Sequence, residues 1–136
     1  MSNKSEGTAF EREFCDILAK HRFWVHNLAA SEHGQPADVI ALRDGKGWLI
    51  DCKVCSTPRG LAFSRIEENQ HYSMLLWCEY VKTEPYFACK LCNGQIYMLP
   101  LYVVKIYVDN GKTAIDDKHI RESGMALDEW IENVIS

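Results

Sequence analysis

PADVIALRDGKGWLIDCKV, residues 36–54, contains two apolar runs separated by Asp44-Gly45, a dipeptide typical of tight hairpin turns. Val, Ile, Leu and Trp dominate both runs, a composition typical of buried strands. We therefore expect antiparallel strands over residues 37–42 and 48–54, joined by the polar segment 43–47.

Three ionisable side chains belong to this hairpin. Asp51 and Lys53 are two residues apart on the second strand, so they share one face of the sheet while Cys52 faces the opposite layer. Pairing of the two strands brings Asp38 beside Asp51. The hairpin thus predicts two carboxylates and one ammonium group at one place on the sheet.

The segment before the hairpin has helical periodicity. Apolar residues between positions 6 and 21 recur at helical spacing and predict an amphipathic first helix. At 100° per residue, Glu11 lies about 60° from the centre of the apolar stripe and Glu13 about 100° away. Glu11 is therefore the acid expected to face the sheet.

The remaining periodicities complete an α/β fold. Ser64 and Glu67 form the pattern of a capping box for a helix that runs to about Glu79. The inward stripe of that helix is Ile66, Gln70, Met74 and Trp77. The other expected elements are strands at 23–28, 86–91, 95–99 and 103–108 and a closing helix at 126–135. These elements predict a mixed central sheet flanked by helices.

Composition favours one compact domain. The chain has 136 residues, of which 47% are hydrophobic and 25% charged, and no linker or repeat interrupts it. We expect a core at about 5–108 and an acidic helical extension at about 109–136. No apolar run reaches the roughly 18 to 20 residues of a membrane span, and the polar start lacks a secretory pattern. These features predict a cytoplasmic protein with reduced cysteines.

Charge is unevenly distributed. The net charge is −4, but residues 1–65 carry 9 Lys and Arg against 8 Asp and Glu, whereas residues 66–136 carry 6 against 11. DNA phosphates attract basic surfaces, so the overall acidity weighs against a DNA-binding function. A cation bound to the acids of the first half would mask part of their charge and leave nearby basic residues to face phosphate.

The paired acids suit a hard divalent cation. Mg²⁺ prefers one or two carboxylates with water and phosphate oxygens, which Asp38 and Asp51 can supply. Such a site supports hydrolysis of a phosphodiester by metal-activated water, with Lys53 orienting the nucleophile or stabilising the oxyanion. Glu11 is placed to hold a second cation or its water shell. Each residue alone has a purely structural interpretation, but together they indicate a catalytic site.

Motifs along the first half carry a family resemblance. Gly7 and Glu11-Arg12-Glu13 fit a Gly-x-x-x-Glu-Arg-Glu helix, and Asp38, Asp51 and Lys53 fit the motif acids and lysine that follow it. Over roughly residues 5–78 the chain resembles the Holliday-junction resolvases of the PD-(D/E)XK nuclease superfamily, of archaeal and phage type. The resemblance implies a restriction-endonuclease-like fold and a metal-dependent endonuclease acting on four-way DNA junctions. It also implies a homodimer, since two symmetric cuts need two sites.

The resemblance extends to neighbouring residues. Ser31 falls in the loop where related resolvases place a serine near the scissile phosphate. Gln70 resembles a glutamine of the Gram-positive and phage enzymes, although a structural hydrogen bond is an equal alternative. The implied cofactor is Mg²⁺, with Mn²⁺ as the alternative. The implied metal ligands are Asp38, Asp51, Glu11 and the backbone carbonyl of Cys52. The residues expected to contact DNA are Lys20, Arg22, His33, Arg59 and Arg65.

Other functions remain open from the sequence. Another repair or restriction nuclease of the superfamily would carry the same acids and lysine, and an inactive nuclease fold would bind DNA or protein without cleavage. The pairs Cys52/Cys55 and Cys89/Cys92 have the CxxC spacing of a zinc site, which would make the chain a zinc-stabilised adaptor. Strand alternation argues against that site, because it sends thiols to opposite faces.

Overall fold

The computed structural model describes residues 3–28 and 37–136. Its helices are α1 (Asn3–Lys20), α2 (Glu68–Tyr80), α3 (Leu101–Asp109), α4 (Asp117–Ser123) and α5 (Leu127–Ile135), with a 3₁₀ turn at Phe63–Arg65. Its strands are β1 (Trp24–Asn27), β2 (Val39–Arg43), β3 (Lys46–Val54), β4 (Leu61–Ala62), β5 (Tyr86–Lys90), β6 (Ile96–Pro100), β7 (Ala114–Ile115) and β8 (Met125–Ala126). The expected order of one helix and three strands in the first half is confirmed.

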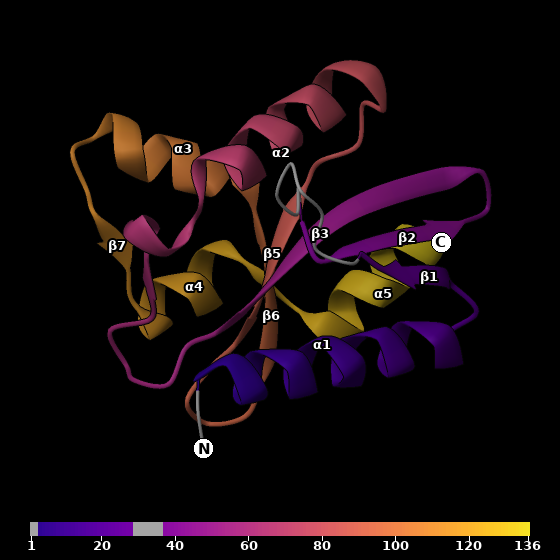
Figure 1. The fold of residues 1–136 in the computed structure, drawn as a ribbon, viewed down its shortest axis with the longest axis horizontal. Helices are drawn as coiled ribbons and strands as arrows, with labels where there is room; N and C mark the ends of the chain where they lie inside the picture. Colours follow the sequence, from indigo (N-terminus) through magenta and orange to yellow (C-terminus); the bar gives the residue numbers. More distant parts are fainter. Residues whose placement is uncertain (1–2, 29–36) are drawn as a thin grey trace.

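A mixed sheet forms the centre of the molecule. Its strand order is β1-β2-β3-β5-β6-β8, and β4 pairs with β7 in a small second sheet. β3 and β5 are parallel, whereas the other neighbours in the large sheet are antiparallel. Helices lie on both sides of the sheet (Figure 1). The expected fold class is confirmed.

Two apolar layers fill the space between sheet and helices. α1 and α5 cover one face, and α2, α3 and α4 cover the other. On the first face Trp130 is 2% exposed, and its ring centroid lies 5.5 to 6.1 Å from those of Phe23, Trp48 and Tyr86. The segment after residue 109 thus contributes to the core, and its strand β8 covers the outer edge of β6.

The β2–β3 hairpin has the turn that its sequence predicts. Asp44 and Gly45 both adopt positive φ, at 53° and 79°, as a tight hairpin turn requires. The register pairs Arg43 with Lys46 and Val39 with Ile50. β3 then continues to Val54 beside β5, past the start of β2. This open stretch of β3 positions the candidate site.

Two local expectations are wrong. Residues 103–108 are part of α3, not a strand. The run is rich in β-branched and aromatic residues, which favour strands. Leu101 and Val104 are buried three residues apart, as on one side of a helix, so their packing overrides the strand propensity. Ser64 does not cap α2, because it lies in the 3₁₀ turn. The cap is Glu67, whose capping box closes with Gln70.

Gly60 occupies a site that excludes a side chain. Its φ is +74°, and an added Cβ would lie 2.2 Å from the Ile115 carbonyl oxygen. We expect Gly60→Ala to lower the free energy of unfolding by roughly 2 to 4 kcal/mol, through backbone strain and this collision. Urea unfolding measures the change. Gly94→Ala is the control, because Gly94 has φ +87° and no atom of the described residues lies within 4 Å of its added Cβ. Equal losses in the two variants would contradict the steric argument.

None of the helices in residues 3–28 and 37–136 combines the length and apolar character that crossing a bilayer requires.

Candidate active site

Asp38 closes the edge of β3 where β2 begins. Its backbone N–H donates to the Ile50 carbonyl at 3.2 Å, and its carboxylate oxygen Oδ2 accepts from the Cys52 N–H at 2.7 Å. Further along the same edge, Arg65 Nη1 donates to the Val54 carbonyl at 2.8 Å. Side chains therefore satisfy backbone groups that a neighbouring strand would otherwise pair. The N–H and C=O of one strand residue point to the same side, so the Cys52 carbonyl also faces this edge.

Asp51 and Lys53 form a buried ion pair on the adjoining face. Lys53 Nζ lies 3.0 Å from Asp51 Oδ2, and the residues are 9% and 0% exposed, respectively. The ammonium also donates to the Arg65 carbonyl at 2.9 Å and to Gln70 Oε1 at 3.3 Å. Strand alternation accounts for the shared direction of the two side chains. The fixed acceptors hold the Lys53 ammonium at one position beside the acid.

Gln70 connects this pair to the start of α2. Its Nε2 donates to Asp51 Oδ1 at 3.2 Å. Its Oε1 accepts from the Glu67 N–H at 3.2 Å and also from Lys53 Nζ. One amide thus completes the helix capping box and contacts both charged residues. The sequence signal for this arrangement is a glutamine inside an otherwise apolar stripe.

The acids of the site repel one another. Burial raises the pKa of Asp51 well above its usual value, and the negative charge of Asp38 raises it further, whereas Lys53 opposes the shift. Two carboxylates crowded in a buried place fit a divalent cation, whose charge offsets this repulsion. The donor set consists of oxygens, as Mg²⁺ and Mn²⁺ prefer.

Glu11 approaches the same place from α1. Burial, followed by the negative charge of Asp38, raises its pKa to about 7. Glu13 is instead tied to β5, because Lys90 Nζ lies 2.6 Å from its Oε1. The two glutamates of the helix motif therefore have different surroundings, and Glu11 is the one influenced by Asp38.

The raised pKa of Glu11 predicts a pH-dependent stability without metal. A carboxyl group with a raised folded-state pKa stabilises the fold fully below its ordinary pKa, and that contribution is lost as the pH rises through about 7. We expect Glu11→Gln to raise the free energy of unfolding at pH 8 by on the order of 1 kcal/mol, a value discounted for solvent screening, and to leave it unchanged at pH 4. Thermal unfolding in EDTA at several pH values measures both. Glu13→Gln is the control, and a Glu11 variant that follows the wild-type pH curve would contradict the prediction.

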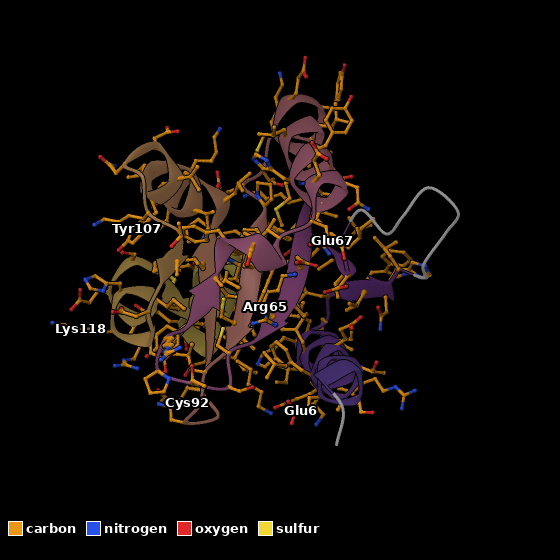
Figure 2. All side chains as sticks on the ribbon, turned by 60° about the vertical axis from the view of Figure 1, so that its left-hand side comes forward. Glu6, Arg65, Glu67, Cys92, Tyr107 and Lys118 are labelled. Carbon is orange, nitrogen blue, oxygen red and sulfur yellow. The ribbon has the colours of Figure 1, made fainter. Side chains whose placement is uncertain are left out.

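The basic residues expected to contact DNA lie in two regions. Figure 2 shows Arg65 between Glu67 at the start of α2 and Glu6 of α1, and Arg59 is exposed in the loop that precedes β4. Lys20 and Arg22 are exposed at the other end of the sheet, near the β2–β3 turn. Of these four residues, Arg65 is the one that contacts the site: its carbonyl accepts from Lys53 and its guanidinium donates to the Val54 carbonyl. Ser31 and His33 lie outside the described residues.

The CxxC cysteines do not converge. Cys55 and Cys89 are buried in the layer under α2, whereas Cys52 belongs to the opposite layer. Cys92 is exposed, and its Sγ donates to Asp117 Oδ2 at 3.2 Å. Within the described ranges no three His, Cys, Asp or Glu side chains enclose an ion by themselves. The separation of the cysteines does not fit a four-thiolate zinc site. A Mg²⁺ site does not need three protein side chains, because Mg²⁺ commonly keeps waters and substrate oxygens among its ligands.

Comparison with known proteins identifies the family. A sequence model described as archaeal Holliday junction resolvase (Hjc) matches residues 2–136. Among solved structures, the chain is similar to the 1.6 Å structure of Archaeoglobus fulgidus Hjc, a Holliday junction resolvase from an archaeal hyperthermophile. The TM-score is 0.67 and the identity 22%, over 92% of this chain and 99% of that chain, which establishes a shared fold. A search among curated sequences gives no significant match.

The family belongs to the PD-(D/E)XK superfamily, and its nucleases depend on a divalent metal ion. The family match spans almost the whole chain, and the motif acids and lysine converge at the open edge of β3. The chain therefore belongs to the archaeal Holliday junction resolvase family and is a structure-specific endonuclease of branched DNA.

Proposed function

We propose that Glu11, Asp38, Asp51 and Lys53 form the cleavage site of a Mg²⁺-dependent, homodimeric resolvase of four-way junctions. The observation that carries this proposal is the convergence of Asp38, Asp51 and Lys53 at the open edge of β3. Burial of two acids beside one ammonium has a stability cost that a purely structural site would not need, which favours a catalytic function.

Each residue has a distinct task in phosphodiester hydrolysis. Asp38, Asp51 and the Cys52 carbonyl would hold the cation, and Glu11 would contribute a further carboxylate. When bound, the divalent cation offsets negative charge that develops on the phosphate. Lys53 donates a hydrogen bond toward the attacking or phosphoryl oxygen, while the Arg65 carbonyl and Gln70 fix its position.

Gln70 acts as a positioning residue in this scheme. It donates to Asp51 and accepts from Lys53, so it holds the acid and the ammonium without contacting substrate. Ser31, in the segment outside the described residues, is proposed to lie near the scissile phosphate. Arg59, Arg65, Lys20 and Arg22, together with His33, which lies outside the described residues, are proposed to contact the DNA backbone.

The homodimer is supported by the outer surface of α2. Tyr72, Leu75 and Tyr80 are 63%, 37% and 74% exposed, although the opposite side of the same helix packs into the core. A helix that packs on the core with one side and exposes large apolar residues on the other favours burial of the exposed side against a partner. A second copy of the chain is that partner here, because two related sites produce the two symmetric cuts of resolution.

A charge on this helix surface should weaken the dimer. Leu75→Glu places an unpaired carboxylate in each half of the proposed interface, so we expect the dimer dissociation constant to rise by about 100-fold. Light scattering across a dilution series measures it, and paired junction cuts should become single nicks. Ile135→Glu is the matched control, since Ile135 is 38% exposed at the end of α5. An unchanged dimer in Leu75→Glu would move the interface elsewhere.

Cleavage of a synthetic four-way junction tests the function directly. The junction, a linear duplex and a flap are incubated with Mg²⁺, Mn²⁺ or EDTA, and the products are mapped on each strand. We expect paired cuts near the crossover of the junction in Mg²⁺ and none in EDTA. Preferential cutting of flap or duplex would overturn junction resolution, and activity with Mn²⁺ alone would overturn the choice of metal.

A further inference from the structure

Trp24 is unusually exposed for a tryptophan. Its side chain is 58% exposed, whereas Trp48 and Trp130 are 6% and 2% exposed and Trp77 packs partly against the core. The indole lies nearly parallel to the imidazole of His26, with ring centroids 6.0 Å apart and an interplanar angle of 14°. An indole in water forgoes the stabilisation that burial of a large aromatic ring provides, so the core does not account for its presence on an edge strand.

The two rings lie on the same face of the sheet as the proposed cleavage site. Trp24 pairs with Leu42 and His26 with Ile40, and the pairing continues to Asp38, whose carbonyl accepts from the Leu28 N–H at 2.8 Å. Residues of β2 two apart share a face, so Asp38 projects to the same side as these pairs. His26 is thus about 7 Å and Trp24 about 14 Å along the strand direction from the acid.

Cationic side chains lie beyond the far end of this row, around the β2–β3 turn and the end of α1. Arg22 precedes β1 by two residues, Lys20 ends α1, and Lys46 begins β3 opposite Arg43, all of them exposed. From one end to the other, the sheet face offers carboxylates, an imidazole and then an indole, and the cationic side chains lie beyond the end of this row. This sequence of groups matches a nucleotide chain that presents one phosphate for cleavage, a base face and further phosphates.

We propose that Trp24, backed by His26, is a stacking surface for a nucleobase at the branch point of the DNA substrate. The inference rests on the proposed cleavage site, because that site defines which sheet face meets DNA. At a branch point the base stack is interrupted, so bases there expose a flat surface that a continuous duplex does not. Stacking on Trp24 therefore distinguishes branched DNA from linear duplex.

Binding of labelled DNA by fluorescence anisotropy in EDTA tests this specificity without cleavage. We expect Trp24→Ala to bind a four-way junction about 10-fold more weakly and a linear duplex as the wild type does. Trp24→Phe, which keeps an aromatic ring, should recover most of the junction affinity. Tyr102→Ala is the control, because Tyr102 is 54% exposed on α3, away from β1. A 2-aminopurine base at the branch point should be quenched by the wild type and not by Trp24→Ala.

The outcomes separate this inference from the proposed function. If the wild type cuts junctions but Trp24→Ala binds them with unchanged affinity, the stacking surface is wrong and the cleavage site stands. Equal weakening on junction and duplex, or dissociation of the dimer by Trp24→Ala, would also overturn stacking. If the wild type neither binds nor cuts junctions, the proposed function itself fails.

Discussion

Asp51→Asn should reduce junction cleavage by about 10³-fold or more while junction binding persists. The substitution keeps the shape of the side chain but removes a negative charge that would help Asp38 and the Cys52 carbonyl to hold a divalent cation. The Asn carbonyl oxygen can still accept from Gln70, while its amino group replaces the Asp51 oxygen that faces Lys53. Single-turnover cleavage in saturating Mg²⁺ measures the chemical step, and anisotropy in EDTA measures binding.

The same variant should be more stable than the wild type when metal is absent. Burial and Asp38 raise the pKa of Asp51, so its contribution to stability is present at low pH and lost as the pH rises toward its folded-state pKa. The asparagine side chain does not ionise, so the variant does not lose stability as the pH rises. We expect Asp51→Asn to have a higher melting temperature than the wild type at pH 7 in EDTA. Asp44→Asn is the control, as the Asp44 side chain is 73% exposed in the same hairpin. Cleavage by Asp51→Asn at a near-wild-type rate would exclude Asp51 as a ligand.

Lys53→Met should lower the single-turnover rate by about 10² to 10³-fold with little effect on duplex or junction affinity. The Lys53 ammonium is buried beside Asp51 and donates to the Arg65 carbonyl and Gln70, so it is pre-organised for charge that develops in the transition state. Met keeps much of the volume of the side chain and removes the charge. Asp51 then loses a cationic neighbour, and its pKa rises further in the absence of metal.

Comparison with a surface lysine makes this result interpretable. Lys105→Met removes an exposed ammonium on α3 and should leave the cleavage rate unchanged. Circular dichroism establishes that both variants are folded. A Lys53→Met protein with normal kcat and weakened DNA binding would instead assign Lys53 to substrate binding alone.

The local geometry of the hairpin could be predicted from the sequence. Asp44-Gly45 fixes the turn, the turn fixes the register, and strand alternation then places Asp51 and Lys53 on one face. The relation between Asp38 and Asp51 follows from the same register. These features depend on residues close together in the chain, which is why sequence patterns determine them.

Features that depend on tertiary packing could not be predicted in this way. Residues 103–108 have strand propensity but form a helix, since Leu101 and Val104 pack against neighbouring elements. Lys53 donates to the backbone carbonyl of Arg65, and because every residue has such a carbonyl, the amino-acid sequence does not reveal this contact. Gln70 was identifiable as a polar residue in an apolar stripe, but its bridge to both charged residues depends on how α2 meets β3.

The double use of the Gln70 amide couples secondary structure to activity. The hydrogen bonds that begin α2 and those that orient Asp51 and Lys53 share one side chain. Fraying of the first helical turn therefore disassembles the cleavage site even when the sheet remains intact. The enzyme is therefore competent only when this helix has docked on the sheet.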